Sequence, residues 1–239
     1  MASDKVDKKA PSDPEAKDDE MDDLFHNNAD RLYKIFHSMN RDAFELTNKE
    51  KPEANNEFYN STAILRYNLE VYSMFIGLYY PLCKTQYSLA STNSSIDPIV
   101  LKNMVNYTDI NLRTSFVTMC GFQFEKILKT IVRRHCLDIK KGPVICRFKK
   151  LSEYFDVNPD ETFNLAKVFY KTRNTLHNGG IVNSNETLEY NSREFRFEIN
   201  EPMRHVRWGW LVFFASEFIR VFIDIADSEK FKKYQASGI

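Results

Sequence analysis

Apolar side chains recur at three- and four-residue steps along most of the chain, which is the pattern of helices that bury one face. The segments between these stripes are short and polar, and glycine and proline are scarce, so the regular elements are expected to be long. The stripes predict five helices, over residues 24–46, 58–80, 108–138, 159–178 and 203–227, with one further helical turn at 151–155.

Residues that break or cap helices indicate where these elements end. Pro81 is expected to end or kink the second helix, and residues 88–97 are expected to form a polar loop. Asn158 and Pro159 suit the N-cap and the first turn of the fourth helix. The Gly-Gly pair at 179–180 is expected to stop that helix, because glycine accepts the left-handed conformation found just beyond many helix ends.

One convincing strand signal stands before the last helix. Residues 187–190 and 194–199 alternate apolar and polar side chains on either side of an Asn-Ser pair, which predicts a small hairpin. The fold class expected from these patterns is therefore all-α. We predict a helical bundle of about five helices with a small β-hairpin inserted before the last helix.

Composition divides the 239 residues into three parts. Residues 1–23 carry nine acids and four lysines, a net charge of −5, and are expected to be a disordered acidic tail. Such a tail either competes with an anionic ligand for basic surface or simply keeps the chain in solution. Residues 24–228 form the predicted helical domain, and residues 229–239 a polar C-terminal end. The formal net charge of zero excludes a uniformly basic nucleic-acid coat.

Several classes of chemistry lack their sequence signatures. The four cysteines form no CxxC pair, and the five histidines show no metal-ligand spacing, so no metal and no cofactor are expected. Phosphate-binding glycine loops and the GxSxG motif are absent as well. Residues 208–226 form the longest apolar run, but Glu217, Arg220 and Asp224 interrupt it. Without a signal peptide or a membrane span, a cytoplasmic location is expected.

The end of the fourth helix carries the strongest candidate for chemistry. Arg173 and His177 are four residues apart, so their side chains lie one turn apart on one helix face, which Tyr170 shares. Guanidinium binds phosphate oxygens in fork geometry, and imidazole moves protons near neutral pH. In RNA the 2′-hydroxyl beside each phosphate is a built-in nucleophile, so cleavage needs only a base, a charge stabiliser and positioning. The same apparatus would leave DNA intact.

Residues 173–180, Arg-Asn-Thr-Leu-His-Asn-Gly-Gly, resemble the motif of the HEPN superfamily. These small α-helical bundles include many metal-independent ribonucleases of toxin, phage-defence and RNA-processing systems. The resemblance implies that Arg173 and His177 are catalytic, with Asn174 as the polar residue after the motif arginine. It also implies an endoribonuclease that works as a homodimer, in which two copies of the motif form one cleft.

The sequence also leaves a second function open. The family usually places four to six residues between the motif Arg and His, whereas three stand between Arg173 and His177. A non-catalytic HEPN-like module that binds RNA or a protein partner, or a purely structural helical adaptor, therefore remains an alternative. Cationic side chains are favoured at any helix C-terminus, and Asn-Gly-Gly is an ordinary helix stop.

Supporting residues are expected around the motif. Asn178 and Tyr170 flank the catalytic pair. Glu125, at the border of the third helix's apolar stripe, either pairs with Arg173 or is exposed beside Lys129. Residues 125–150 hold nine basic and two acidic side chains, a local charge of +7, which either steers RNA or is a solvated helix end and loop. The predicted nucleic-acid contacts are Lys126, Lys129, Arg133, Arg134, Lys140 and Lys141.

Overall fold

The computed structural model describes residues 29–53, 55–92, 97–139, 142–199 and 207–236. Within them the chain forms seven helices and one two-stranded sheet, so the expected all-α bundle with a hairpin insert is confirmed. The acidic tail at 1–23 lies outside the described residues. The elements are α2 (Ala29–Thr47), α3 (Glu57–Thr92), α4 (Pro98–Arg134), α5 (Val144–Phe155), α6 (Pro159–His177), β1 (Glu186–Tyr190), β2 (Arg193–Phe197), α7 (Trp208–Asp227) and α8 (Glu229–Ala236).

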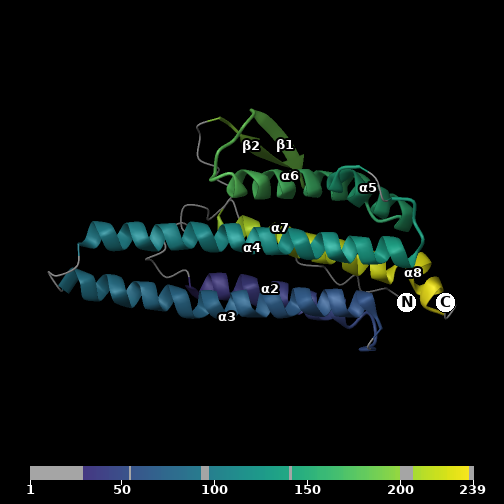
Figure 1. Cartoon of the computed structure of the whole chain (residues 1–239), viewed down its shortest axis with the longest axis horizontal. Coiled ribbons are helices and arrows are strands. Elements are labelled where there is room, and N and C mark those ends of the chain that lie inside the picture. The colour runs from purple at the N-terminus through teal and green to yellow at the C-terminus, as the bar shows by residue number, and fades with distance from the viewer. Residues whose placement is uncertain (1–28, 54, 93–96, 140–141, 200–206, 237–239) are drawn as a thin grey trace, which may run out of the picture.

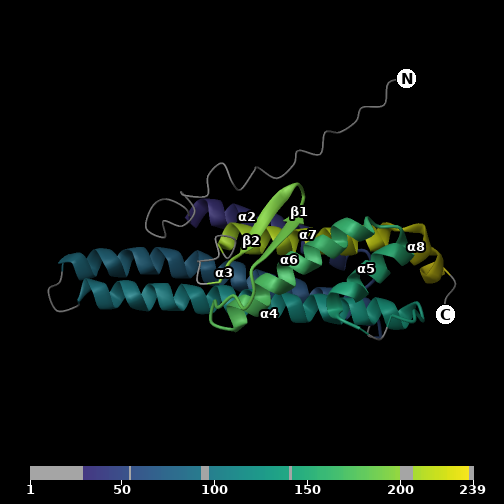
Figure 2. The same cartoon turned by 90° about the horizontal axis from the view of Figure 1, so that it is seen from above.

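The helices stack in layers (Figure 1). The long helices α3 and α4 run antiparallel and project well beyond the rest of the molecule at one end. Helix α2 packs on α3 and α7, while α5 and α6 form a further layer with the hairpin beside them. Figure 2 shows α6 crossing obliquely over α7 and α4. Because of this crossing, the end of α6 lies against α4.

Aromatic side chains fill the space between the layers. The ring of Phe124 on α4 stacks on Phe218 of α7 at 4.8 Å between centroids, and Phe169 of α6 lies 5.1 Å from the same Phe218 ring. Close to the start of α7, the buried Trp208 donates from its indole nitrogen to the Asp109 carboxylate at 2.9 Å. Helix α7 is buried along most of its length, which explains why its sequence is apolar almost all round.

Two helices are longer than the sequence pattern predicted. Helix α3 passes through Pro81 and ends at Thr92, so of the two expectations for Pro81, an end or a kink, the end was wrong. Before the proline, α3 is held against α4 by the Tyr79 hydroxyl, which donates to the Val105 carbonyl at 3.1 Å. Helix α4 starts ten residues before the predicted position, because Asp97 caps it by accepting from the Ile99 amide at 2.8 Å. Residues 88–92 of the predicted polar loop at 88–97 therefore belong to α3, and residues 93–96 lie outside the described residues.

The remaining differences between prediction and structure are helical segments that the sequence pattern missed. The single turn predicted at 151–155 is the end of the twelve-residue α5, whose Phe148, Leu151 and Phe155 are buried at i, i+3 and i+7. The segment set apart as a polar C-terminal end contains α8, which buries Phe231 against the bundle. The seven described helices thus exceed the five that apolar stripes alone predicted.

The hairpin and the end of the fourth helix match the prediction. Asn191 and Ser192 join β1 to β2 with positive φ angles of 52° and 58°, as a tight two-residue hairpin turn requires. Helix α6 ends at His177, and the Gly180 amide then donates to the Thr175 carbonyl at 2.8 Å, the long bond of a Schellman motif. Asn158 occupies the N-cap position of α6 but makes no side-chain capping bond there.

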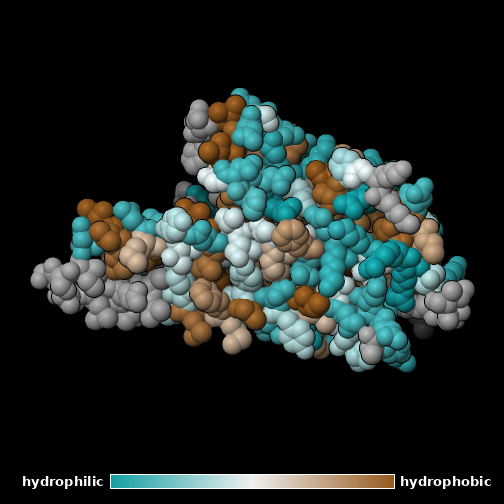
Figure 3. Space-filling view, in the orientation of Figure 1, coloured by the Kyte–Doolittle hydropathy of each residue, from teal (hydrophilic) through white to brown (hydrophobic). Residues whose placement is uncertain are grey.

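The outer faces of the α3–α4 hairpin carry exposed apolar side chains, which appear as brown patches in Figure 3. By contrast, the half of this view that contains the C-terminal end of α4 is mostly hydrophilic. None of the helices described is apolar over a stretch long enough to cross a bilayer.

Candidate functional site

Arg173 lies where α6 crosses α4, over a gap left by a glycine. The guanidinium stem passes so close to Gly121 of α4 that a Cβ atom there would lie 3.0 Å from Arg173 Cδ and 3.1 Å from its Nε. The Arg173 side chain keeps only 18% of its surface exposed. A glycine inside a helix costs stability, so its presence at the crossing fits a need for close approach.

The Arg173 guanidinium ends between an acid and an aromatic ring of α4. Its Nη1 lies 3.9 Å from a Glu125 carboxylate oxygen, and its carbon lies 4.9 Å from the centroid of the Phe122 ring. Of the two placements that the sequence allowed for Glu125, the structure therefore shows the one beside Arg173. The distance is at the outer limit of an ion pair, so the guanidinium keeps donors available for another anion.

Tyr170 lies one turn before Arg173 and is buried beneath it. Its hydroxyl donates to the Gly121 carbonyl at 3.4 Å, and the Arg173 guanidinium carbon is 5.8 Å from its ring centroid. Burial raises the pKa of the Tyr170 phenol far above its usual range, and the nearby Glu125 charge raises it further. The phenol therefore stays protonated and serves to position Arg173 and α4 rather than to move protons.

His177 and Asn174 are exposed at the C-terminal turn of α6. The Asn174 side chain points about 100° around the helix from Arg173, as the helical repeat dictates. Asn178 follows as the C-cap, and its backbone amide donates to the Asn174 carbonyl at 3.0 Å. The predicted catalytic pair thus has two environments: Arg173 is restrained against α4, while the imidazole of His177 faces solvent.

The predicted basic surface is only partly available. Lys126 and Lys129 are exposed on α4, and no residue in the described part of the chain forms an ion pair with them. Arg133 is exposed and pairs with Glu57 at 2.9 Å. Exposed pairs of this kind contribute about 0–1 kcal/mol, so a phosphate can replace the carboxylate. Lys140 and Lys141 lie outside the described residues.

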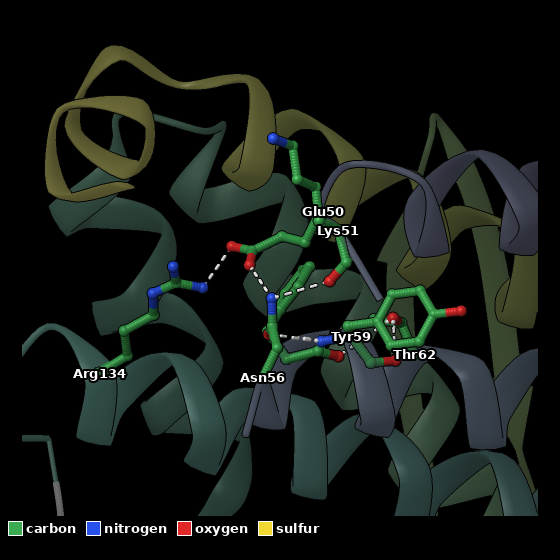
Figure 4. A network of polar contacts seen from close by, with 7 residues as sticks. Glu50, Lys51, Asn56, Tyr59, Thr62 and Arg134 are labelled. Carbon is green, nitrogen blue, oxygen red and sulfur yellow. Dashed lines mark hydrogen bonds and ion pairs between the residues drawn. The ribbon is translucent and has the colours of Figure 1, made fainter. Parts of the chain in front are cut away.

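Arg134 has a structural environment instead. It donates to the Glu50 carboxylate, which also accepts from the Asn56 amide, so the arginine ties the end of α4 to the loop before α3 (Figure 4). Its guanidinium carbon also lies 5.2 Å from the Phe231 ring centroid and 5.7 Å from that of Tyr234. Arg134 is therefore engaged within the protein, which argues against it as an RNA contact.

The two cavities described lie away from the motif. One of about 610 Å³ is formed by the loop at 48–53 with Asn56 and Arg134, and a smaller one of about 140 Å³ is lined by Tyr190, Glu217 and Arg220 among others. Neither is lined by Arg173 or His177. Within the described residues, no group of His, Cys, Asp and Glu side chains is arranged to hold a metal ion.

Sequence reasoning missed two residues of this site. Gly121 and Phe122 fall inside the predicted helix at 108–138, where no role was assigned to them, and both contact Arg173. The signal available was an isolated glycine in the middle of an apolar helix, which often marks a close approach of another element. The exposure of Phe122 gave no signal, because its neighbours in sequence are mostly apolar.

Comparison with protein-family models, with curated proteins and with solved structures found no match to the chain. The relationship to the HEPN superfamily therefore stays a prediction that depends on the residues of the motif.

Proposed function

We propose that the protein is a metal-independent endoribonuclease of the HEPN type. His177 acts as the general base or acid, Arg173 stabilises the charge on the phosphate in flight, and Asn174 orients the phosphate or one of these groups. Glu125, Tyr170 and the helix stop at Asn178 support the pair from α4 and from the end of α6.

The proposed reaction uses the nucleophile that RNA carries. A base takes the proton of the 2′-hydroxyl, the 2′-oxygen attacks the adjacent phosphorus, and the bond to the 5′-oxygen breaks as that oxygen gains a proton. The products are a 2′,3′-cyclic phosphate and a 5′-hydroxyl. A fixed guanidinium beside the phosphorus stabilises the added negative charge on the equatorial oxygens, which is the largest contribution that a protein can make to such a step.

The observation that carries the proposal is the restraint on Arg173. An arginine that serves only the helix dipole points at the last carbonyls of its own helix. Arg173 instead crosses to α4, where Gly121 admits its stem and Phe122 and Glu125 flank its guanidinium. A cation pre-organised in this way, one turn from an exposed imidazole, supports phosphate binding at a defined place.

A homodimer is part of the proposal. The motif of one copy forms only one wall of the proposed cleft, because Arg173 is backed by α4 while His177 and Asn174 face solvent. A second copy related by a two-fold axis would supply the opposite wall and a second motif. Sedimentation measured at the concentrations used for cleavage is expected to give the mass of a dimer, and a monomer that cleaves at full rate would contradict this part.

The chemistry is tested by the ends that cleavage leaves. RNA incubated with the protein in EDTA is expected to yield 2′,3′-cyclic phosphate and 5′-hydroxyl ends. An oligonucleotide with one ribose and 2′-deoxy sugars elsewhere should be cut only after that ribose. Products with 5′-phosphate ends, or equal cleavage of the all-deoxy strand, would show a different reaction.

The alternative is a non-catalytic module that binds RNA or a protein partner. The short spacing between Arg173 and His177 favours it, because the HEPN motif usually has four to six residues between its Arg and His and this chain has three. Under this alternative the wild type and His177→Ala bind RNA with equal affinity and neither cleaves it.

A cytoplasmic toxin or phage-defence setting is proposed from the resemblance. Three free thiols, Cys120, Cys136 and Cys146, agree with a reducing compartment.

A further inference from the structure

We propose that α4 carries a track for single-stranded RNA, on which one unpaired base stacks against Phe122 while phosphates follow the lysines along the helix. This inference rests on the proposed function in so far as the ligand is RNA. It adds the form of that RNA, single-stranded at the site, and a residue that reads it.

The track is one stripe of α4. Phe122, Lys126, Lys129 and Arg133 stand at i, i+4, i+7 and i+11, which places them within about 60° of one another around the helix. Three cations thus follow one aromatic ring at axial steps of about 4.5–6 Å. The lysines are exposed, and the carboxylate on Arg133 is itself exposed and replaceable.

Phe122 is an unusual residue for this position. Its side chain is 58% exposed on a helix whose opposite face already supplies the core. The Arg173 guanidinium lies over the ring at 4.9 Å, so a cation–π contact holds the ring beside the catalytic arginine. A base stacked on the solvent-facing part of this ring would place its own phosphate within reach of that guanidinium.

The geometry favours an unpaired base over a duplex. A side chain reaches the flat surface of a base only where the base is unstacked from its neighbours, as in loops, bulges and ends. A ring beside a row of cations is the arrangement by which single strands are bound without strong sequence preference. Cleavage through the 2′-hydroxyl also needs a flexible backbone, because attacking oxygen, phosphorus and leaving oxygen must come into line.

A different occupant of this surface is a second copy of the chain or a protein partner. Ile181, just beyond the motif, is also an exposed apolar side chain. If Phe122 serves a protein interface, its replacement changes the oligomeric state and leaves the affinity for RNA per protomer unchanged. That outcome would overturn the stacking proposal.

The test measures RNA binding in a His177→Ala background, so that the RNA stays whole. The probes are a labelled single-stranded RNA containing 2-aminopurine and a blunt RNA duplex of the same length. Phe122→Leu is expected to weaken single-strand binding about tenfold and to abolish the change in 2-aminopurine fluorescence that binding causes, while duplex binding is unchanged. Phe122→Trp should restore both signals. Tyr107→Leu, an exposed aromatic elsewhere on α4, is the matched control and should change neither.

The two proposals fail in distinguishable ways. If the His177→Ala protein binds neither RNA, the proposed function fails. If it binds the single strand and Phe122→Leu binds it equally well with the same change in 2-aminopurine fluorescence, only the stacking site fails. Lys126→Gln and Lys129→Gln should each lower the slope of log affinity against log salt by about 0.7, as one phosphate contact on a single strand requires. If neither substitution changes this slope, the lysines do not contact phosphates and the proposed RNA track on α4 is wrong.

Discussion

The environment of Arg173 is built by residues that do no chemistry themselves. Gly121 provides space, Glu125 and Phe122 flank the charge, and the Tyr170 hydroxyl, held protonated by burial, fixes the backbone of α4 below it. Such packing removes rotamer freedom from a long side chain before any substrate arrives, so less entropy is lost when a phosphate binds. Substitutions at Gly121, Phe122 and Glu125 should therefore affect cleavage more than folding, whereas Tyr170 also belongs to the buried core.

Gly121→Ala is the sharpest test of this packing. The new Cβ would sit 3.0 Å from Arg173 Cδ, so the flexible arginine has to move away from Glu125 and Phe122. The alanine also adds up to about 1 kcal/mol of helix propensity, which offsets the displacement. Cleavage is expected to fall about tenfold or more while the free energy of unfolding, measured in urea, changes by less than about 1 kcal/mol.

Gly77→Ala is the matched control, since a Cβ on Gly77 of α3 would meet no heavy atom within 4 Å. It should gain the same helix propensity and leave cleavage at the wild-type rate. Equal effects of the two substitutions on cleavage would show that the contact between Arg173 and α4 does not matter for activity.

At the scale of elements, contacts between the ends of helices hold several of them together. The last turn of α4 meets α5 and α8 around His135, whose ring centroid lies 5.0 Å from Phe155, 5.3 Å from Phe231 and 4.6 Å from Tyr234. The Nε2 atom of this imidazole is buried and has no hydrogen-bond partner among the described residues. Helix α8 therefore packs over a histidine that has to remain neutral.

This packing predicts an acid-sensitive fold. Burial, with help from the Arg134 charge and against that of Glu50, lowers the pKa of His135 to about 4. The unfolded imidazole takes up its proton near pH 6.5, so the unfolded state gains protons first and stability falls as the pH drops from about 6.5 to about 4. Allowing for partial solvent contact, the loss is about 1–2 kcal/mol. Urea unfolding measured at several pH values is expected to show this loss of stability.

His135→Phe should remove this component of the pH dependence, because the ring contacts remain and the titrating group is gone. His37→Phe, at an exposed position on α2, should leave the acid loss as it is in the wild type. Identical pH dependence in the wild type and His135→Phe would refute the assignment.

Helix existence could be predicted from sequence, but several helix ends and contacts could not. The stripes of α2, α6 and α7 repeat over several turns, and the turn chemistry at 179–180 and 191–192 is local, so both were predicted correctly. The continuation of α3 through Pro81 depends on packing against α4, which no local pattern contains. Likewise, Arg173 and His177 could be selected from their spacing, whereas Phe122 joins them only because α6 crosses α4 at Gly121.

At the scale of the whole molecule, the relevant property is the distribution of charge along the chain. The acidic tail at 1–23 carries −5 and leaves +5 on residues 24–239, with the densest positive stretch at 125–150. Opposite charges on one chain attract at low ionic strength and are screened beyond about 10 Å at 0.1 M salt. A tail of this charge is expected to compete with RNA for the exposed cations of α4.

Deleting residues 1–23 should therefore strengthen RNA binding several-fold at low salt, and the gain should vanish as salt rises. Fluorescence anisotropy with labelled RNA at several salt concentrations measures both effects. A tail with its nine acids replaced by Asn and Gln and its four lysines replaced by Gln is the matched control for length, and should behave like the deletion. If the deletion changes nothing at any salt concentration, the tail is a plain solubilising segment.

We propose that Arg173 and His177 break RNA together. The most direct measurement is the single-turnover rate of RNA cleavage in EDTA by the wild type, by His177→Ala and by His37→Ala as a control histidine. We expect the wild type and His37→Ala to cleave alike, and His177→Ala to be at least about a hundredfold slower. Cleavage by His177→Ala at the wild-type rate would contradict this proposal.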